Sequence, residues 1–215
     1  MTKDDSFARR LESFLKGPRN AWRLMFSAMG READLMLELQ GRSVAVVGNA
    51  RALEGRVMGD AIEAHDLVLR FNRAPIPDPR SHGRRTDWIA AGAPIGEELA
   101  QARGVSRVIW VTKLRKMPDW MYQSERAVML PRRRQDALAR TLGARPSSGL
   151  FMIDLLARSR CRAATLYGFD FFQTRSLSGG RGAAEVPHDF GREKEWVREL
   201  IARDRRFSID GAAHG

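Results

Sequence analysis

The sequence has little cysteine and no long hydrophobic run. Cys161 is the single cysteine among 215 residues. One cysteine excludes a disulfide bond within the chain and fits a reducing compartment. No segment approaches the ~18 consecutive apolar residues of a transmembrane helix, and the polar, acidic residues 1–5 are unlike the start of a secretory signal peptide. We therefore expect a cytoplasmic protein.

Residue patterns typical of metal sites are also missing. The chain has 4 histidines, and no group of histidine, aspartate and glutamate residues has the spacing of metal ligands. No Asp-x-Asp motif occurs anywhere in the sequence. We expect neither a bound metal nor another cofactor.

Acidic residues are too few to balance the basic ones. Lysine and arginine number 37 against 26 aspartates and glutamates, which gives a net charge of +11, and arginine is dense at residues 132–134 and 203–206. Arginine binds phosphate and carboxylate groups, and a basic surface attracts anionic membranes and nucleic acids. The charge fits a solvated arginine-rich surface, an anionic substrate or an anionic membrane. Because the chain has no zinc-finger spacing, RNP-like segment or sharply basic tail, we expect no nucleic-acid partner.

The length and a hydrophobic content of 43% indicate one globular domain. From residue 43 onward, short apolar runs alternate with helical patterns. This alternation predicts an α/β fold with a mainly parallel sheet and helices on both faces. The expected strands are residues 43–47, 67–71, 87–91, 108–112, 127–130 and 164–167, and the expected helices are residues 150–159 and 193–205.

The N-terminal part of the chain has a helical pattern. Apolar residues recur at helical spacing between residues 6 and 39, with a break at Gly17-Pro18. Amphipathic helices usually cover a core, although a basic segment with an apolar face also suits an anionic membrane surface. We expect residues 1–41 to form a helical segment packed on a domain of residues 42–210.

Polar residues and glycines follow several of the predicted strands. Ligands of open parallel sheets bind beyond the carboxyl ends of the strands, which here include Asn49, Asn72, Gly92 and Gly168. Gly48 allows a ligand to approach the backbone closely, and the Asn49 amide offers donors and an acceptor. The segment lacks the further glycines of a dinucleotide fingerprint and the Gly-Lys-Ser/Thr of a phosphate-binding P loop.

The second predicted strand ends in Arg70-Phe71-Asn72-Arg73. On a strand, Arg70 and Asn72 share one face. Asn72 would then stand near Asn49, where two amides could read a base, a ribose or a phosphate. The alternatives are a plain turn at Asn49 and an edge strand that turns into a loop at Asn72.

Ser147, Ser148 and Gly149 precede an apolar helix. Either serine is able to cap that helix, and the free N–H groups of its first turn are able to hold a phosphate or a carboxylate. Capping alone is the alternative, because the same groups serve both purposes.

His188 and Glu193 lie where the last predicted helix begins. Imidazole titrates near neutrality, so a positioned histidine accepts a proton from an attacking hydroxyl. Glu193 would orient the other ring nitrogen of His188 or stabilise the helix N-terminus. A structural histidine at a helix start is the alternative.

Taken in order, these segments resemble the sialylmotifs of glycosyltransferase family 29. Residues 43–92 resemble the large motif, residues 146–169 resemble the small motif, and His188 with Glu193 matches the very small motif. The resemblance implies a single GT-A-like (Rossmann-like) domain and a metal-independent, inverting transferase. Its donor would be a CMP-activated acid sugar such as CMP-sialic acid, and its acceptor a glycan or glycolipid hydroxyl.

The resemblance also implies a role for each motif residue. Asn49 and Asn72 would contact the cytidine nucleotide, and His188 would be the base that deprotonates the acceptor. Ser147, Ser148 and Gly149 would help to hold the nucleotide.

Two departures from the family pattern bear on the function. Family members usually carry a further histidine that assists the departing phosphate, but residues 170–187 contain none. The usual disulfide between the large and small motifs is excluded by the single cysteine. The alternatives are therefore a CMP-Kdo transferase, a non-catalytic CMP-binding module and, more remotely, a basic nucleic-acid-binding protein.

Overall fold

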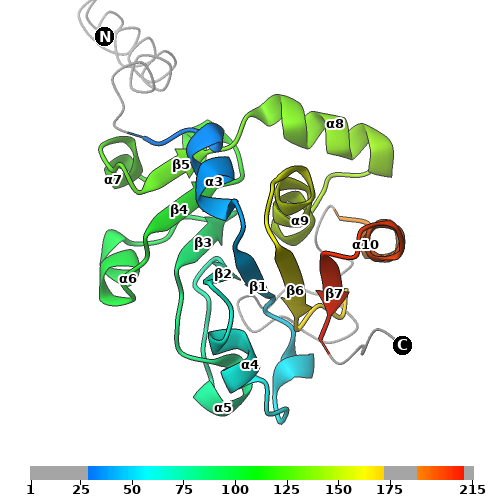
Figure 1. Ribbon diagram of the computed structural model, residues 1–215. Helices are drawn as coiled ribbons and strands as arrows, with labels where there is room; N and C mark the ends of the chain where they lie inside the picture. The colour runs from blue at the N-terminus through cyan, green and yellow to red at the C-terminus, as the bar shows by residue number, and fades with distance from the viewer. Residues whose placement is uncertain (1–28, 172–187, 211–215) are drawn as a thin grey trace, which may run out of the picture.

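The computed structural model describes residues 29–171 and 188–210, which form seven parallel strands flanked by helices (Figure 1). Every pair of neighbouring strands is parallel. The order is β5-β4-β3-β2-β1-β6-β7, so the direction of winding reverses between β1 and β6. The strands are β1 (Ser43–Val47), β2 (Leu67–Phe71), β3 (Trp88–Ala91), β4 (Arg107–Trp110), β5 (Ala127–Met129), β6 (Ala163–Tyr167) and β7 (Phe207–Ile209).

Helices cover both faces of the sheet. The strands are almost wholly apolar because neither of their faces meets water. In β1, Val44 and Val46 belong to the larger apolar cluster, whereas Ala45 and Val47 belong to a cluster on the opposite face. On the first face lie α3 (Glu32–Leu39), α8 (Arg132–Leu142), α9 (Ser148–Arg158) and α10 (Phe190–Arg203), and on the second lie α4 (Gly59–Glu63), α6 (Glu97–Ala102) and α7 (Asp119–Tyr122), with α5 (Pro79–His82) beside α4.

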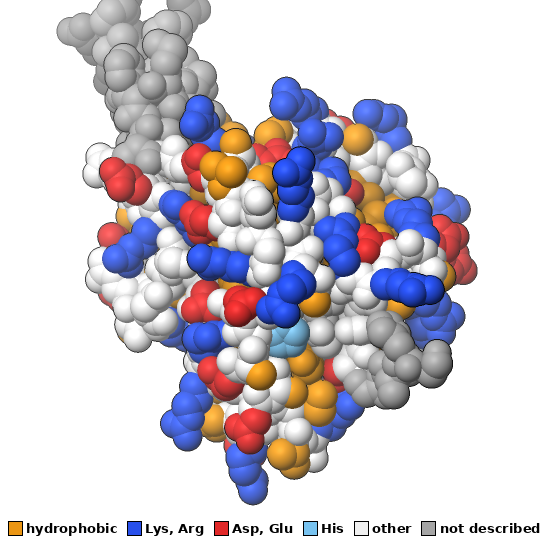
Figure 2. Space-filling view, in the orientation of Figure 1, with side chains coloured by type: hydrophobic (Ala, Val, Ile, Leu, Met, Phe, Trp, Pro, Cys, Tyr) orange, Lys and Arg blue, Asp and Glu red, His pale blue; other side chains and the backbone are white. Residues whose placement is uncertain are grey.

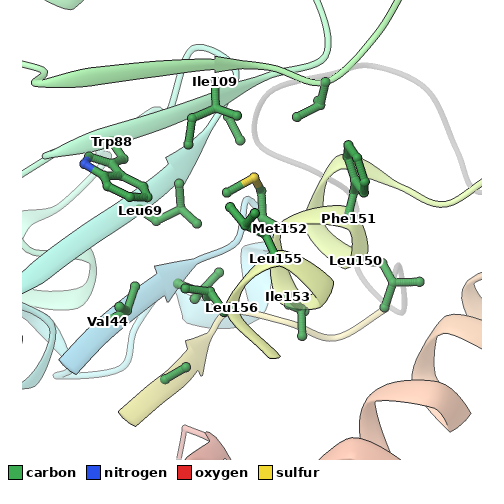
Figure 3. Close-up of a cluster of buried hydrophobic side chains, with 14 of the residues drawn as sticks. Val44, Leu69, Trp88, Ile109, Leu150, Phe151, Met152, Ile153, Leu155 and Leu156 are labelled. Carbon is green, nitrogen blue, oxygen red and sulfur yellow. The ribbon is translucent and has the colours of Figure 1, made fainter. Parts of the chain in front are cut away.

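Helix α9 lies at the centre of the larger cluster. Its side chains face Val44, Leu69, Trp88 and Ile109 of the sheet (Figure 3). Leu150, Phe151, Met152, Ile153, Leu155 and Leu156 of this helix are all buried. A helix that is apolar on most sides is stable only inside a core. Its N-terminus is therefore held in a fixed place above the sheet.

Helix α3 joins the same core from the N-terminal part of the chain. Leu35 and Leu39 are fully buried. Two ion pairs fix its flank, from Arg158 to Glu32 at 2.7 Å and from Arg107 to Glu38 at 2.6 Å. The C-terminal part of the expected N-terminal helical segment is thus present as a packed helix, while residues 1–28 lie outside the described part. Within residues 29–171 and 188–210, no helix combines the length and apolar character needed to span a bilayer.

The predicted fold class is confirmed, and the six expected strands are present within a residue or two of their expected ends. The elements that were not individually expected are the short helices α4 to α7, the longer helix α8 and the short strand β7, which extends the sheet beyond β6. The closing helix begins at Phe190, with the Asp189 side chain accepting from the backbone N–H of Arg192 at 3.0 Å. The prediction placed its start at Glu193, one turn too late.

Candidate functional site

A cavity of about 630 Å³ opens where β1, β2, β3 and β6 end, beside the point where the strand order reverses. Open α/β sheets bind their ligands at such a point, and the volume falls within the usual range for small-molecule sites. The lining includes every residue that the sequence proposed for the site, namely Asn49, Asn72, Ser147, Ser148, Gly149, His188 and Glu193. The fold thus brings together residues that are spread over most of the chain.

Glycines let the backbone segments of this cavity approach one another. A Cβ atom on Gly48 would lie 2.5 Å from the carbonyl oxygen of Gly168, so the ends of β1 and β6 meet without room for a side chain. A Cβ atom on Gly92 would lie 2.7 Å from the Ser148 hydroxyl oxygen. Glycine at position 92 therefore lets the end of β3 contact the start of α9.

The two asparagines are fixed by hydrogen bonds at the strand ends. The Nδ2 group of Asn49 donates to the carbonyl oxygen of Phe71 at 3.2 Å. The backbone N–H of Asn72 donates to Ala90, and its Oδ1 accepts from the N–H of Gly92, both at 2.9 Å. Asn72 has a φ of 55°, in the left-handed region that asparagine tolerates better than most residues.

Arg70 does not share the surroundings of Asn72, contrary to the prediction from strand alternation. Arg70 is only 1% exposed, and its guanidinium donates to the carbonyl oxygens of His82 at 2.6 Å and Arg85 at 2.9 Å. Burial lowers the pKa of Arg70 to about 10. The alternation stops because the left-handed turn at Asn72 ends the strand. Arg70 therefore supports the loop after β2, and Asn72 lines the cavity.

Ser147 connects the start of α9 with α10. Its hydroxyl oxygen caps α9 by accepting from the N–H of Leu150 at 3.1 Å. The same hydroxyl donates to Glu193 Oε2 at 2.7 Å, and the Ser147 N–H donates to Glu193 Oε1 at 2.6 Å. Glu193 is only 3% exposed. Burial raises the pKa of Glu193, and the two hydrogen bonds from Ser147 partly offset that effect.

His188 is oriented by a backbone carbonyl group. Its Nδ1 lies 2.9 Å from the carbonyl oxygen of Arg145, which is able only to accept a hydrogen bond. The proton is therefore on Nδ1, and Nε2 keeps its lone pair. Burial lowers the pKa of His188, with the nearby Arg145 charge acting in the same direction and the bond to the Arg145 carbonyl acting against both. The edge of the Phe190 ring lies beside it, with centroids 5.8 Å apart.

The ring-orienting role that the sequence suggested for Glu193 is thus filled by Arg145 instead. Glu193 binds Ser147, on the nucleotide side of the expected site. Its place in the first turn of α10 still agrees with the second suggested role, because a negative charge stabilises a helix N-terminus.

Part of the cavity wall was not predicted. Apolar side chains complete it, among them Ile95, Leu150, Ile153 and Phe171. The rings of Phe71 and Phe169 meet edge to face, with centroids 6.0 Å apart. No short motif marks these positions, since each is an ordinary apolar residue until the fold places it. Among the described residues, no cluster of three or more His, Cys, Asp or Glu side chains could hold a metal ion.

Comparisons with known proteins agree with this geometry. The model of glycosyltransferase family 29 (sialyltransferase) matches residues 6–122. A rice protein, Sialyltransferase-like protein 2 of Oryza sativa subsp. indica, is 40% identical over 77 residues, which are 33% of this chain and 18% of the relative. The chain thus covers less than a fifth of that relative's length.

Solved structures of sialyltransferases have the same fold. A mammalian sialyltransferase superposes with a TM-score of 0.61 at 20% identity, over 85% of this chain and 78% of that chain. A mammalian sialyltransferase in complex with Gal-beta-1-3GalNAc-ortho-nitrophenol gives a TM-score of 0.59 at 18% identity, over 85% and 79%. The sialyltransferase CST-II in complex with CMP gives 0.56 at 11% identity, over 78% and 80%. Because the family match spans more than half of the sequence, the chain belongs to glycosyltransferase family 29, the sialyltransferase family.

Proposed function

We propose that this protein is a metal-independent, inverting glycosyltransferase. It moves sialic acid, or a related acid sugar, from a CMP-sugar donor to a hydroxyl group of a glycan or glycolipid. The observation that carries the proposal is the cavity itself, which unites two asparagines, the start of α9 and a histidine whose Nε2 is able to accept a proton. A solved relative in fold is a sialyltransferase in complex with CMP, which supports the choice of nucleotide.

The nucleotide binds between the ends of β1 and β2 and the start of α9. The N–H groups of a helix's first turn have no partner within the helix, and they hold phosphate groups well. At α9, the N–H of Ser147 already donates to Glu193 and that of Leu150 to Ser147. The N–H groups of Ser148 and Gly149 are therefore the ones that face the donor phosphate, and Asn72 Nδ2 donates to the nucleotide beside them.

His188 activates the acceptor. Its Nε2 takes the proton of the acceptor hydroxyl as that oxygen attacks the anomeric carbon of the donor sugar. The bond from the anomeric carbon to the phosphate oxygen breaks, and its electron pair leaves with CMP. The proton then rests on His188, whose positive charge the Arg145 carbonyl stabilises through Nδ1.

Two other functions fit parts of the same site. A CMP-Kdo transferase would use the same groups, because its donor shares the nucleotide and a carboxylated anomeric carbon. A non-catalytic CMP-binding module would need the nucleotide side of the cavity but not His188. Transfer activity that depends on His188 separates both transferases from the module, and the choice of donor separates the transferases from each other.

The first test is the binding of nucleotides to the purified protein. We expect calorimetric titration in the presence of EDTA to show binding of CMP and much weaker binding of UMP, GMP and AMP. The EDTA matters because the proposal assigns no role to a metal. Equal binding of all four nucleotides, or no binding at all, would contradict the proposal.

A basic surface beside the cavity supports contact with an anionic membrane. We define this basic surface as residues 113–119 and 132–145, which carry eight basic and two acidic side chains and thus a charge of +6 out of the chain's +11. Two hydrogen bonds join the second segment to the residues just before the first, from Gln135 to Val111 at 3.2 Å and from Arg145 to Thr112 at 3.3 Å. Lys and Arg side chains line the part of the molecule formed by α8 (Figure 2).

The basic surface also lies beside the catalytic groups, since the carbonyl of Arg145 orients His188. An acceptor glycolipid in the inner face of an anionic membrane would then be presented close to the base. We propose that the protein binds this face peripherally through the basic surface.

Sedimentation with lipid vesicles tests this contact. We expect binding to vesicles that contain phosphatidylglycerol and little binding to vesicles of phosphatidylcholine alone. Removing three surface charges should weaken binding about a hundredfold, since each basic residue near an anionic membrane contributes about 1 kcal/mol. The variant is Arg133→Gln/Arg134→Gln/Arg140→Gln, and the control is Arg126→Gln/Arg160→Gln/Arg205→Gln, which removes equally exposed charges at the opposite edge of the sheet. Equal losses in both variants would mean that only total charge matters and would contradict the docking surface.

A further inference from the structure

One cationic side chain in the cavity has no role in the mechanism above. Arg73 is the only lysine or arginine among the described residues that line the cavity. The other titratable residues of that lining are His188 and two acids, Asp170 and Glu193. A donor with a phosphate and a carboxylate therefore meets more negative than positive charge there, unless Arg73 takes part.

The backbone holds Arg73 in an unusual turn. The residues on either side, Asn72 and Ala74, have φ angles of 55° and 45°. Left-handed backbone is rare for residues other than glycine and persists only where the surroundings hold it in place. Here the Ala74 N–H donates to Phe71 at 3.0 Å, and Arg103 donates to the Ala74 carbonyl at 2.5 Å. The backbone of Arg73 is thus held in place by its neighbours on both sides.

The guanidinium of Arg73 is exposed and makes no hydrogen bond or ion pair with another described residue. Other arginines around the cavity differ in this respect. Arg145 donates to Thr112 at 3.3 Å, and Arg192 donates to the Leu142 carbonyl at 2.7 Å. Arg73 is therefore able to bind a ligand without first giving up a bond to a described residue.

We propose that Arg73 binds the phosphate of the cytidine nucleotide and stabilises its charge as CMP leaves. This inference rests on the proposed function. The guanidinium fork is suited to phosphate oxygens, and donors aimed at developing charge lower the barrier of the step in which that charge appears. Arg73 contributes only hydrogen bonds and charge to this step, while the electron pair of the broken bond stays on the phosphate oxygen.

The position of Arg73 in the chain indicates that it binds the phosphate of the nucleotide and not the base or the ribose. Asn72 binds Gly92, and a Cβ atom on Gly92 would touch the Ser148 hydroxyl oxygen at 2.7 Å. Asn72 is therefore next to the start of α9, where the phosphate is expected. Residues 170–187 contain no histidine, so the histidine that family members usually use at the phosphate is not available in that segment.

The test compares CMP with cytidine, which lacks the phosphate. Titrations use the wild-type protein, Arg73→Gln and Arg73→Lys. We expect Arg73→Gln to weaken CMP binding about ten- to a hundredfold, as for the loss of a hydrogen bond to a charged group, and to leave cytidine binding unchanged. Arg73→Lys should recover part of the loss, because it keeps the charge. Unchanged cytidine binding also shows that the variant is folded.

Arg51→Gln is the matched control, because Arg51 is exposed just beyond the end of β1, at the same edge of the sheet, and does not line the cavity. Its CMP and cytidine affinities should equal those of the wild type. If the ratio of CMP affinity to cytidine affinity in Arg73→Gln equals that of the wild type, the inference about Arg73 is wrong, while the proposed function still stands. A third titration, with the CMP-sugar, gives a further outcome against the inference. If Arg73→Gln loses affinity for the CMP-sugar but not for CMP, Arg73 binds the donor carboxylate instead of the phosphate. Failure of the wild type to bind either ligand would overturn the proposed function and the inference together.

Discussion

Replacing His188 with alanine should reduce sugar transfer by about two to four orders of magnitude, the usual contribution of a general base. CMP affinity should stay close to that of the wild type. The reason is geometric, since His188 is held by the Arg145 carbonyl through Nδ1 and makes no hydrogen bond to the residues expected to hold the nucleotide. Initial rates with CMP-sialic acid and calorimetry with CMP check the two halves of this prediction.

The pH dependence of the wild type gives a second measure of the same role. A general base works in its neutral form, so activity should be lost as the pH falls through the pKa of His188. Burial lowers that pKa below the ordinary value of about 6.5, so the acidic limb of kcat/KM should lie below that pH.

His65→Ala is the control for the His188 variant, because His65 lies just before β2, at the opposite end of the strand from the cavity. It should retain transfer activity. A large loss of CMP affinity in His188→Ala would instead make His188 a nucleotide ligand.

Replacing Glu193 with alanine should damage both stability and nucleotide binding. The substitution leaves the N–H and the hydroxyl of Ser147 without their buried acceptor. Losing such a partner costs about 1–3 kcal/mol of the free energy of unfolding. CMP should also bind more weakly, because Ser147 precedes the turn that is expected to hold the phosphate. Denaturant unfolding and calorimetry with CMP measure the two effects.

Glu193→Gln should fall between alanine and the wild type. Its amide oxygen is able to accept from the Ser147 N–H, and the Ser147 hydroxyl is able to turn and accept from the new amide group. Glu195→Ala is the matched control, since Glu195 is an exposed acid on the same helix, and such surface changes stay within about 0.5 kcal/mol. If Glu193→Ala slowed transfer but left stability and CMP affinity intact, the carboxylate would act in the chemical step instead.

Much of the sheet was predictable because its strands are short runs of β-branched and other apolar residues. Ser43–Val47 and Leu67–Phe71 form strands over the expected residues. Helix α8 was missed because it starts with three arginines and buries only Leu138 and Leu142, which is too little for a clear pattern. Strand β7 has three residues and depends on pairing with β6. The sequence of β7 is too short to show the apolar run that marks β1 and β2.

The location of the site was predictable for a related reason. Parallel strands end at one edge of the sheet, so polar residues that follow strands converge there whatever lies between them. The partners of the individual side chains were not predictable in this way. The bond that Ser147 donates to Glu193 and the bond between His188 and the Arg145 carbonyl join residues 46 and 43 positions apart. These hydrogen-bond partners depend on how α10 packs against α9, and no local sequence pattern predicts that packing.

Four hydrogen bonds tie the start of α10 to the end of α8 and to the segment that leads into α9. His188 bonds to the Arg145 carbonyl, Ser147 donates to Glu193 from both its N–H and its hydroxyl, and Arg192 donates to the Leu142 carbonyl. The part proposed to recognise the donor and the part proposed to activate the acceptor are therefore joined to each other directly. The orientational entropy of aligning the base with the sugar is then lost once, when the chain folds, and not in every catalytic cycle.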